Sequence, residues 1–427
     1  MTYIYNERLK EGYYKEVLEN GLTVLVYPNE NKTSTYAMLS APVGSTTLDF
    51  SVNNEEMSVP LGTAHFLEHK LFENEDGVDA FSLFALTGAS ANAYTSFDKT
   101  TYLFEASLDV EQSLRTLIGF VSSPYFTEAT VAKEQGIIGQ EIKMYRDHPS
   151  WRQLFELFKL LYDTHPIKHE IAGTIESIAE ITPSSLYSFY NAFYDPTKMV
   201  LAVAGNIKAE TVVDICKEMY EGKEYIGDIC TAKRYFDDSV VTEKRVEIIM
   251  PISSPQFCYG FKEKPYKKED RAKNELVYDM LLDIICGQTS TLFRKLYDNN
   301  LINDILSAEV FSGVDYLSVV FSGESVDPDK VIEEIDKEIE KFRIEGIDDE
   351  RFIECKRSYL GDIIGDFEDI STVAANLTDC QFNDTGIFDI LDIIEGITKE
   401  DMEVLLKNSL NRDMFALVVV YPSTLDN

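Results

Sequence analysis

The sequence has little of several features that large classes of proteins require. Lysine and arginine together number 39 against 74 aspartates and glutamates, so the formal net charge is −35. Such a chain lacks the basic surface that contacts phosphates, and we expect no nucleic-acid partner and no docking on anionic lipid. No stretch approaches the run of about 20 apolar residues that spans a membrane, so no membrane segment is expected.

Cysteine is also scarce and scattered. The six cysteines begin only at Cys216 and contain no C-x-x-C pair, which argues against a disulfide framework and predicts reduced thiols in the core. The first residues show neither the basic nor the apolar region of a signal peptide. Together these features predict a cytoplasmic protein.

Two domains are expected from the length of the chain. It has 427 residues, and a single core rarely serves more than about 250–300 residues. A faint internal repeat supports this division, since GLTVLVYP at 21–28 is echoed by KRVEIIMP at 244–251. We predict an N-terminal half at 1–230, a linker at 231–243, and a structurally related C-terminal half without a metal site at 244–427.

Strand and helix patterns alternate irregularly along both halves. Strand patterns cover 22–27, 36–41, 100–106, 199–204 and 414–421, and helical patterns cover 110–121, 128–145 and 151–162. Because the two types mix without strict βαβ order, the sequence predicts an α+β fold. We expect two homologous α/β sandwich halves, each a mostly antiparallel sheet faced by helices.

The stretch GTAHFLEHKLFE at 62–73 carries the chemistry. It contains H-x-x-E-H, with His65 and His69 one helical turn apart and Glu68 on the same side. Two neutral imidazoles suit Zn²⁺, and a nearby carboxylate that is not a ligand can take a proton from the water that the metal activates. The spacing therefore indicates a hydrolytic zinc site.

A hydrolytic zinc site takes three protein ligands and keeps a fourth position open. The helical pattern over 128–145 offers Glu134 and Glu141, which are seven residues apart on one face. Glu141 can then bind the metal, while Glu134 lies close by as a carboxylate that contacts a metal ligand and not the metal itself. Glutamates at this spacing also occur on solvated helix faces, and short motifs arise by chance. Yet the chain has only five histidines, and two of them stand in this motif.

These segments resemble the zinc helix and the third-ligand helix of the pitrilysin–insulysin family, an inverzincin family with H-x-x-E-H. The resemblance is strongest to its processing-peptidase branch and, within that, to the bacterial YmfH-like peptidases. It implies one Zn²⁺ per chain, held by His65, His69 and Glu141. It also implies that Glu68 is the general base and Glu134 an assisting catalytic carboxylate.

A further segment, residues 88–104, resembles the strand that pairs with substrate in this family. The resemblance implies that Asn92 and Ala93 offer backbone groups to an extended peptide. Adding a strand to a sheet edge gives affinity through the main chain without strong demands on sequence. An ordinary structural strand is the alternative.

The C-terminal half departs from the family pattern. Family members usually carry an arginine and a tyrosine, seven residues apart, that stabilise the developing oxyanion. Here the arginine position falls at Tyr297 and the tyrosine position near Asn303 or Asp304, while Arg294 is displaced and has no tyrosine seven residues later. The expected partner is therefore a related paralogue without zinc that supplies Arg and Tyr in a heterodimer. The alternative is a homodimer or a monomer in which Arg294, or the metal alone, suffices.

Three functions fit these observations. The first is a zinc endopeptidase subunit that hydrolyses unfolded peptides in an enclosed chamber. The second is a non-catalytic interaction subunit, although such a subunit has no reason to keep His65, Glu68, His69 and Glu141. The third is a binding protein with structural zinc, although such sites are usually closed by four ligands. Maturation of a ribosomally made peptide or bacteriocin and general peptide turnover both remain open as roles.

Overall fold

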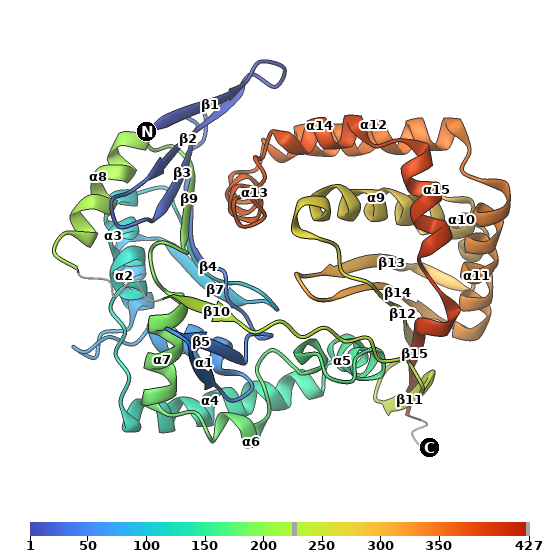
Figure 1. Ribbon diagram of the computed structural model, residues 1–427, viewed down its shortest axis with the longest axis horizontal. Coiled ribbons are helices and arrows are strands. Elements are labelled where there is room, and N and C mark those ends of the chain that lie inside the picture. The colour runs from blue at the N-terminus through green and yellow to red at the C-terminus, as the bar shows by residue number, and fades with distance from the viewer. Residues whose placement is uncertain (224–228, 424–427) are drawn as a thin grey trace. The chain divides into compact units, whose positions relative to one another are not determined.

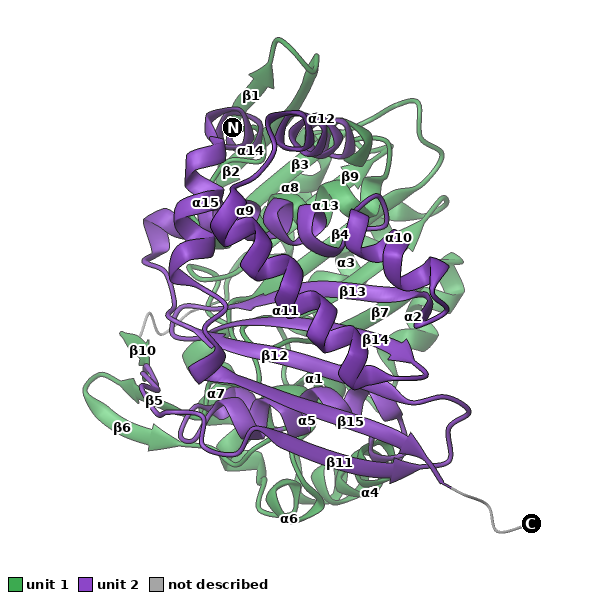
Figure 2. Cartoon of the chain, turned by 90° about the vertical axis from the view of Figure 1, so that its right-hand side faces the viewer, with its two compact units in different colours: residues 1–142, 170–233, 364–388 green, residues 143–169, 234–363, 389–427 purple. Residues whose placement is uncertain are grey.

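The computed structural model describes residues 1–223 and 229–423, which fold into two compact units (Figure 2). Unit 1 comprises Met1–Ile142, Glu170–Lys233 and Ile364–Phe388, and unit 2 comprises Lys143–His169, Arg234–Ile363 and Asp389–Asn427. Each unit thus takes in a segment from the other half of the sequence. The division at 231–243 stays a prediction about the linear sequence, and one change of unit falls at Lys233.

The main sheet of unit 1 has seven strands in the order β1-β2-β3-β9-β4-β8-β7 (Figure 1). All neighbours are antiparallel except β3 and β9. The strands are β1 (Thr2–Asn6), β2 (Glu11–Val17), β3 (Thr23–Pro28), β4 (Thr35–Ala41), β7 (Ser90–Thr95), β8 (Thr100–Ala106) and β9 (Val200–Gly205). A small sheet joins β10 (Cys230–Ala232), β5 (Asp49–Val52) and β6 (Glu55–Ser58), so β10 includes the first residues of the predicted linker.

Helices cover this sheet because their apolar faces match it. In α3 (Val110–Val121), Leu114, Leu117, Ile118 and Val121 recur at helical spacing and are buried, and the helix packs on β8 and β4. The helix α13 (Ile370–Phe382) packs on β9 and β4. The other helices are α1 (Thr63–Leu71), α2 (Ala80–Thr87), α4 (Glu128–Arg146, which continues into unit 2), α6 (Ile175–Ile178), α7 (Pro183–Phe193) and α8 (Ala209–Tyr220).

Unit 2 repeats the strand plan with five strands in the order β11-β15-β12-β14-β13. Its parallel pair is β11 with β15, as β3 with β9 in unit 1, and its other pairs are antiparallel. The strands are β11 (Arg245–Met250), β12 (Gln256–Glu263), β13 (Ile302–Ser312), β14 (Leu317–Ser325) and β15 (Phe415–Pro422). The predicted α+β fold with two related halves is therefore confirmed.

The helices of unit 2 enclose a core between α9 and the sheet. In that core, Tyr259, Leu281, Ile285 and Phe321 are fully or almost fully buried, and α5 packs on β12 and β15. The helices are α5 (Pro149–Leu161), η1 (Pro166–Lys168), α9 (Lys268–Cys286), α10 (Thr291–Asp298), α11 (Pro328–Glu345), α12 (Asp349–Asp366, whose last residues belong to unit 1), α14 (Asp389–Gly396), α15 (Lys399–Asn408) and η2 (Arg412–Met414).

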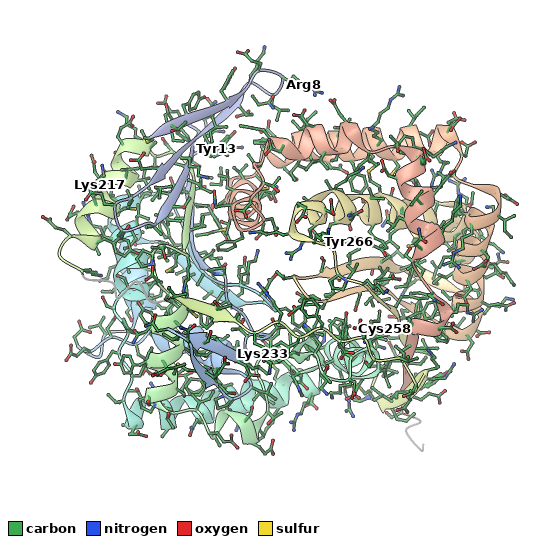
Figure 3. All side chains as sticks on the ribbon, viewed as in Figure 1. Arg8, Tyr13, Lys217, Lys233, Cys258 and Tyr266 are labelled. Atoms are coloured by element: carbon green, nitrogen blue, oxygen red, sulfur yellow. The ribbon has the colours of Figure 1, made fainter. Side chains whose placement is uncertain are left out.

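The cysteines form no disulfide. All six are in the thiol form, and four of them are buried. Cys258 on β12, labelled in Figure 3, lies 3.6 Å from the amide oxygen of Gln153 on α5. None of the described helices has the length and apolar character that crossing a membrane demands.

Candidate functional site

The helix α1 places the H-x-x-E-H residues. It starts after Gly62, whose φ of +87° favours glycine. A Cβ atom there would also lie 2.4 Å from the carbonyl oxygen of Ala172, so a larger residue would displace the start of the helix. His65 and Glu68 are buried within this helix. Gly62 therefore sets where α1 begins, and with it the positions of His65 and Glu68.

Glu141 on α4 reaches both histidines. His65 Nε2 lies 3.6 Å from Glu141 Oε1, and His69 Nε2 lies 3.4 Å from Glu141 Oε2. One ligand atom of each of the three residues lies within 4.8 Å of the others. The structure thus brings together the three predicted zinc ligands, which are 76 residues apart in sequence from first to last (141 − 65).

This set of donors fits a zinc ion. Two imidazole nitrogens and a carboxylate converge, and each presents a lone pair when the histidines are neutral. Such groups repel one another unless a cation lies between them, and N₂O donor sets with one free position are those of catalytic zinc. Among the described residues, these three form the one group with this geometry, so no fourth protein ligand closes the site.

Glu68 lies beside these ligands as a separate carboxylate. It is only 7% exposed, and its Oε2 accepts a 2.6 Å hydrogen bond from the hydroxyl of Thr95. Burial raises the pKa of Glu68, while the nearby His65 and the Thr95 hydroxyl oppose that rise. A carboxylate with a raised pKa beside a metal site is well suited to accept a proton.

Glu134 supports His69 from the side away from the ligand atoms. Its Oε1 lies 3.1 Å from His69 Nδ1, and its side chain is buried. Burial alone would lower the pKa of His69, but the hydrogen bond to Glu134 and the carboxylates of Glu68 and Glu141 together raise it. With Nδ1 donating to Glu134, the proton-free nitrogen of a neutral His69 is Nε2, the atom that faces Glu141. The Nδ1 of His65 has no such partner among the described residues.

A buried lysine joins the end of α1 to α4. Lys70 is fully buried, and its ammonium group pairs with Glu73. Glu73 also accepts from Lys133 on α4 at 2.8 Å, one residue before Glu134. These two lysines lower the pKa of Glu73 against the effect of burial. The helix carrying the histidines is therefore tied to the helix carrying the glutamates at a second point.

The predicted substrate strand is the last strand in the order of the seven-stranded sheet. Asn92 and Ala93 lie on this strand, β7, and Asn92 is exposed. The amide oxygen of Asn92 accepts from the Ala93 N–H at 2.9 Å. The strand next to β7 is β8, and the other edge of β7 pairs with no described strand.

The residues at the expected Arg and Tyr positions all lie in unit 2. Tyr297 and Arg294 are exposed on α10, and Asn303 and Asp304 lie at the start of β13. Tyr297, Asn303 and Asp304 line one hollow of about 580 Å³. These residues do not include an arginine followed seven residues later by a tyrosine, the spacing usual in the family.

Sequence reasoning missed two residues of the site, Thr95 and Lys70. Thr95 follows Asn92 and Ala93 in a strand of alternating residues, so its side chain could have been placed on the same face as that of Ala93. No sequence signal identifies Lys70 as buried, because lysines on helices are nearly always exposed.

Comparison with known proteins places this architecture in a family. A profile described as "Insulinase (Peptidase family M16)" matches residues 26–175, and one described as "Peptidase M16 inactive domain" matches residues 180–359. The chain is 36% identical to the uncharacterised zinc protease YmfH of Bacillus subtilis over 98% of each protein.

Solved structures of M16 proteins have the same fold as this chain. An M16-like peptidase from Alicyclobacillus acidocaldarius shares 30% identity and superposes with a TM-score of 0.92 over 96% of this chain and 98% of that one. The periplasmic protease PqqL of Escherichia coli has the same fold, with a TM-score of 0.74 at 18% identity over 98% of this chain and 48% of that chain. The chain belongs to the M16 family of pitrilysin-type zinc peptidases and is similar to YmfH.

Proposed function

We propose that this chain is the catalytic subunit of a zinc-dependent endopeptidase that hydrolyses unfolded peptides. One observation carries the proposal: the donor atoms of His65, His69 and Glu141 converge within 4.8 Å, beside the separate carboxylate of Glu68. Membership of a zinc peptidase family supports it. The full set of residues argues against a subunit that has lost its activity.

The chemistry follows from the roles of these side chains. A bound zinc ion would lower the pKa of a water molecule and polarise the peptide carbonyl. Glu68 accepts one proton from the attacking water and then donates it to the nitrogen of the leaving amine as the C–N bond breaks. Glu134 keeps the His69 ring oriented through Nδ1.

The open edge of β7 offers a place for the substrate. An extended peptide that pairs there would be bound through its main chain, with little demand on its sequence. The Asn92 amide would have to leave the Ala93 N–H for that N–H to donate to the peptide. An unfolded chain can supply such a strand, whereas a stably folded protein cannot, and the enclosed chamber that the family resemblance implies would exclude folded proteins as well.

We further propose that the active form is a heterodimer. Tyr297 stands at the position of the arginine, and Asn303 or Asp304 near that of the tyrosine, which the family resemblance implies as the oxyanion donors; losing one such donor costs about 10²–10³ in rate. A related chain without H-x-x-E-H could supply both groups. Assays of the purified chain with and without that partner test this, and full activity of the lone chain, unchanged by the partner, would refute it.

The proposed function is tested by replacing the base. Glu68→Gln should keep one zinc per chain and lose about 10²–10⁴-fold in turnover of an unstructured peptide. Glu128→Gln on the exposed start of α4 is a matched control with the same change of charge. Near-normal turnover by the Glu68→Gln protein would show that the assignment is wrong. Rapid digestion of a stable globular protein would contradict the restriction to unfolded peptides.

A further inference from the structure

The hydroxyl group of Thr95 donates its hydrogen bond to Glu68. Its Oγ1 donates to Glu68 Oε2 at 2.6 Å, and an ionised carboxylate has no proton to give in return. The hydroxyl also lies 3.4 Å from Thr100 Oγ1, across the β7–β8 pair. The Thr100 hydroxyl donates its own hydrogen bond to the carbonyl oxygen of Val43 at 2.9 Å. The shorter bond to a charged acceptor is also the stronger one, so Thr95 serves Glu68.

The backbone of Thr95 faces the open edge of the sheet. Beyond the end of β7, the Ser96 N–H donates to the Lys99 carbonyl oxygen at 2.8 Å, which points that N–H toward the returning strand. Backbone groups alternate in direction along an antiparallel strand, so those of Thr95 and Ala93 point away from β8. The bond between the Ala93 N–H and the Asn92 side chain agrees with this direction.

The side chain of Thr95 lies on the helix-covered face of the sheet. Thr95 pairs with Thr100 and Ala93 with Tyr102, and side chains of such cross-strand partners share a face. Tyr102 is fully buried, and its hydroxyl bonds to that of Tyr194 at 2.9 Å. The neighbouring strand β8 is therefore held in place by buried contacts. A movement of the end of β7 would shift the Thr95 hydroxyl and, through its hydrogen bond, the Glu68 carboxylate.

We propose that Thr95 is a positioning residue that couples the binding of a peptide on β7 to the placement of the Glu68 carboxylate. The proposal rests on the proposed function. A peptide that pairs with the outward backbone groups of Ala93 and Thr95 fixes the end of the strand, and the Thr95 hydroxyl then fixes Glu68. Because Thr95 occupies Oε2, the proton of the attacking water goes to Oε1.

The test compares three variants under conditions in which the wild type cleaves an unstructured peptide. Thr95→Val removes the hydroxyl at nearly constant shape, and Thr95→Ser retains it. Thr100→Val is the matched control, because it removes a buried hydroxyl from the opposite strand but leaves the bond between Thr95 and Glu68 in place. For each protein, kcat, KM, zinc content and melting temperature are measured.

We expect Thr95→Val to lower kcat by about 10-fold or more, the effect of one hydrogen bond to a charged group. KM and zinc content should stay within twofold of the wild type. Thr95→Ser should recover most of the loss, and Thr100→Val should lower the melting temperature with little effect on kcat. A purely structural role predicts instead that kcat follows the melting temperature across all three variants.

A wild-type kcat in Thr95→Val, or a loss in Thr95→Ser equal to that in Thr95→Val, would overturn the inference while leaving the proposed function intact. A loss in Thr100→Val as large as that in Thr95→Val would also overturn it. If the zinc-loaded wild type cleaves no peptide with or without its partner, the proposed function itself fails, and the inference fails with it.

Discussion

Replacing Glu134 should weaken zinc binding without touching a predicted ligand. Its carboxylate lies 3.1 Å from His69 Nδ1 and is 5% exposed, so water cannot readily take its place. Removing such a supporting carboxylate typically costs 10–100-fold in metal affinity. Since each tenfold change corresponds to about 1.4 kcal/mol, the expected loss is about 1.4–2.8 kcal/mol.

The two substitutions at this position should differ. Glu134→Gln keeps an oxygen that can accept from Nδ1 but removes its charge, so we expect a loss near 10-fold. Glu134→Ala removes the acceptor and leaves the His69 ring free to turn, so we expect a loss near 100-fold. Glu128→Gln, at the exposed start of the same helix, should stay within twofold of the wild type.

The assay is competition for zinc with a chromophoric chelator of known affinity, which reports a dissociation constant without any need for activity. Melting temperatures of the metal-free variants show whether α4 remains folded. Wild-type affinity in both Glu134 variants would refute the role of this carboxylate as a support for His69. An equal loss in Glu128→Gln would attribute the effect to overall charge instead.

Four further predictions follow from the structure. His69→Ala should abolish stoichiometric zinc binding, as elemental analysis would show. Gly62→Ala should lower the melting temperature of the metal-free chain by several degrees, because its Cβ meets the Ala172 carbonyl oxygen at a positive φ. Asp237→Asn should destabilise unit 2 by about 3–5 kcal/mol in urea titrations, because it leaves the buried Lys262 ammonium without the carboxylate that lies 2.6 Å away. Burial and the nearby Glu275 and Glu309 raise the pKa of Asp279 to about 6, so its ionised form destabilises the fold. Asp279→Asn should therefore add about 2 kcal/mol of stability at pH 7.5 and almost none at about pH 3, where the carboxyl is largely protonated in both the folded and the unfolded chain.

Residues close in sequence were the most predictable part of the site. His65, Glu68 and His69 share one helix, so spacing alone placed them on one side of it. Glu141 and Glu134 were placed together by their own helix, but their approach to α1 depends on tertiary packing. The spacing could not show that Glu134 meets Nδ1 while Glu141 meets the two Nε2 atoms.

The sheets illustrate the same limit. The strand at 100–106 was predicted at its observed bounds, because alternation along one strand is a local signal. The order of the strands is not local, and neither is the exchange that places α5 in unit 2 and α13 in unit 1. Thr95 shows what this means for function, since only the pairing of β7 with β8 reveals that its backbone and its hydroxyl face different neighbours.

The most direct test of the account is a zinc titration of the metal-free chain, assayed alone and with its related partner. Bound zinc and cleavage of an unstructured peptide are followed in the same samples, with Glu68→Gln in parallel. The account predicts that cleavage rises with bound zinc and saturates at about one ion per chain, and that Glu68→Gln binds the same ion but does not cleave. Cleavage that is independent of zinc, or that persists in Glu68→Gln, would contradict it.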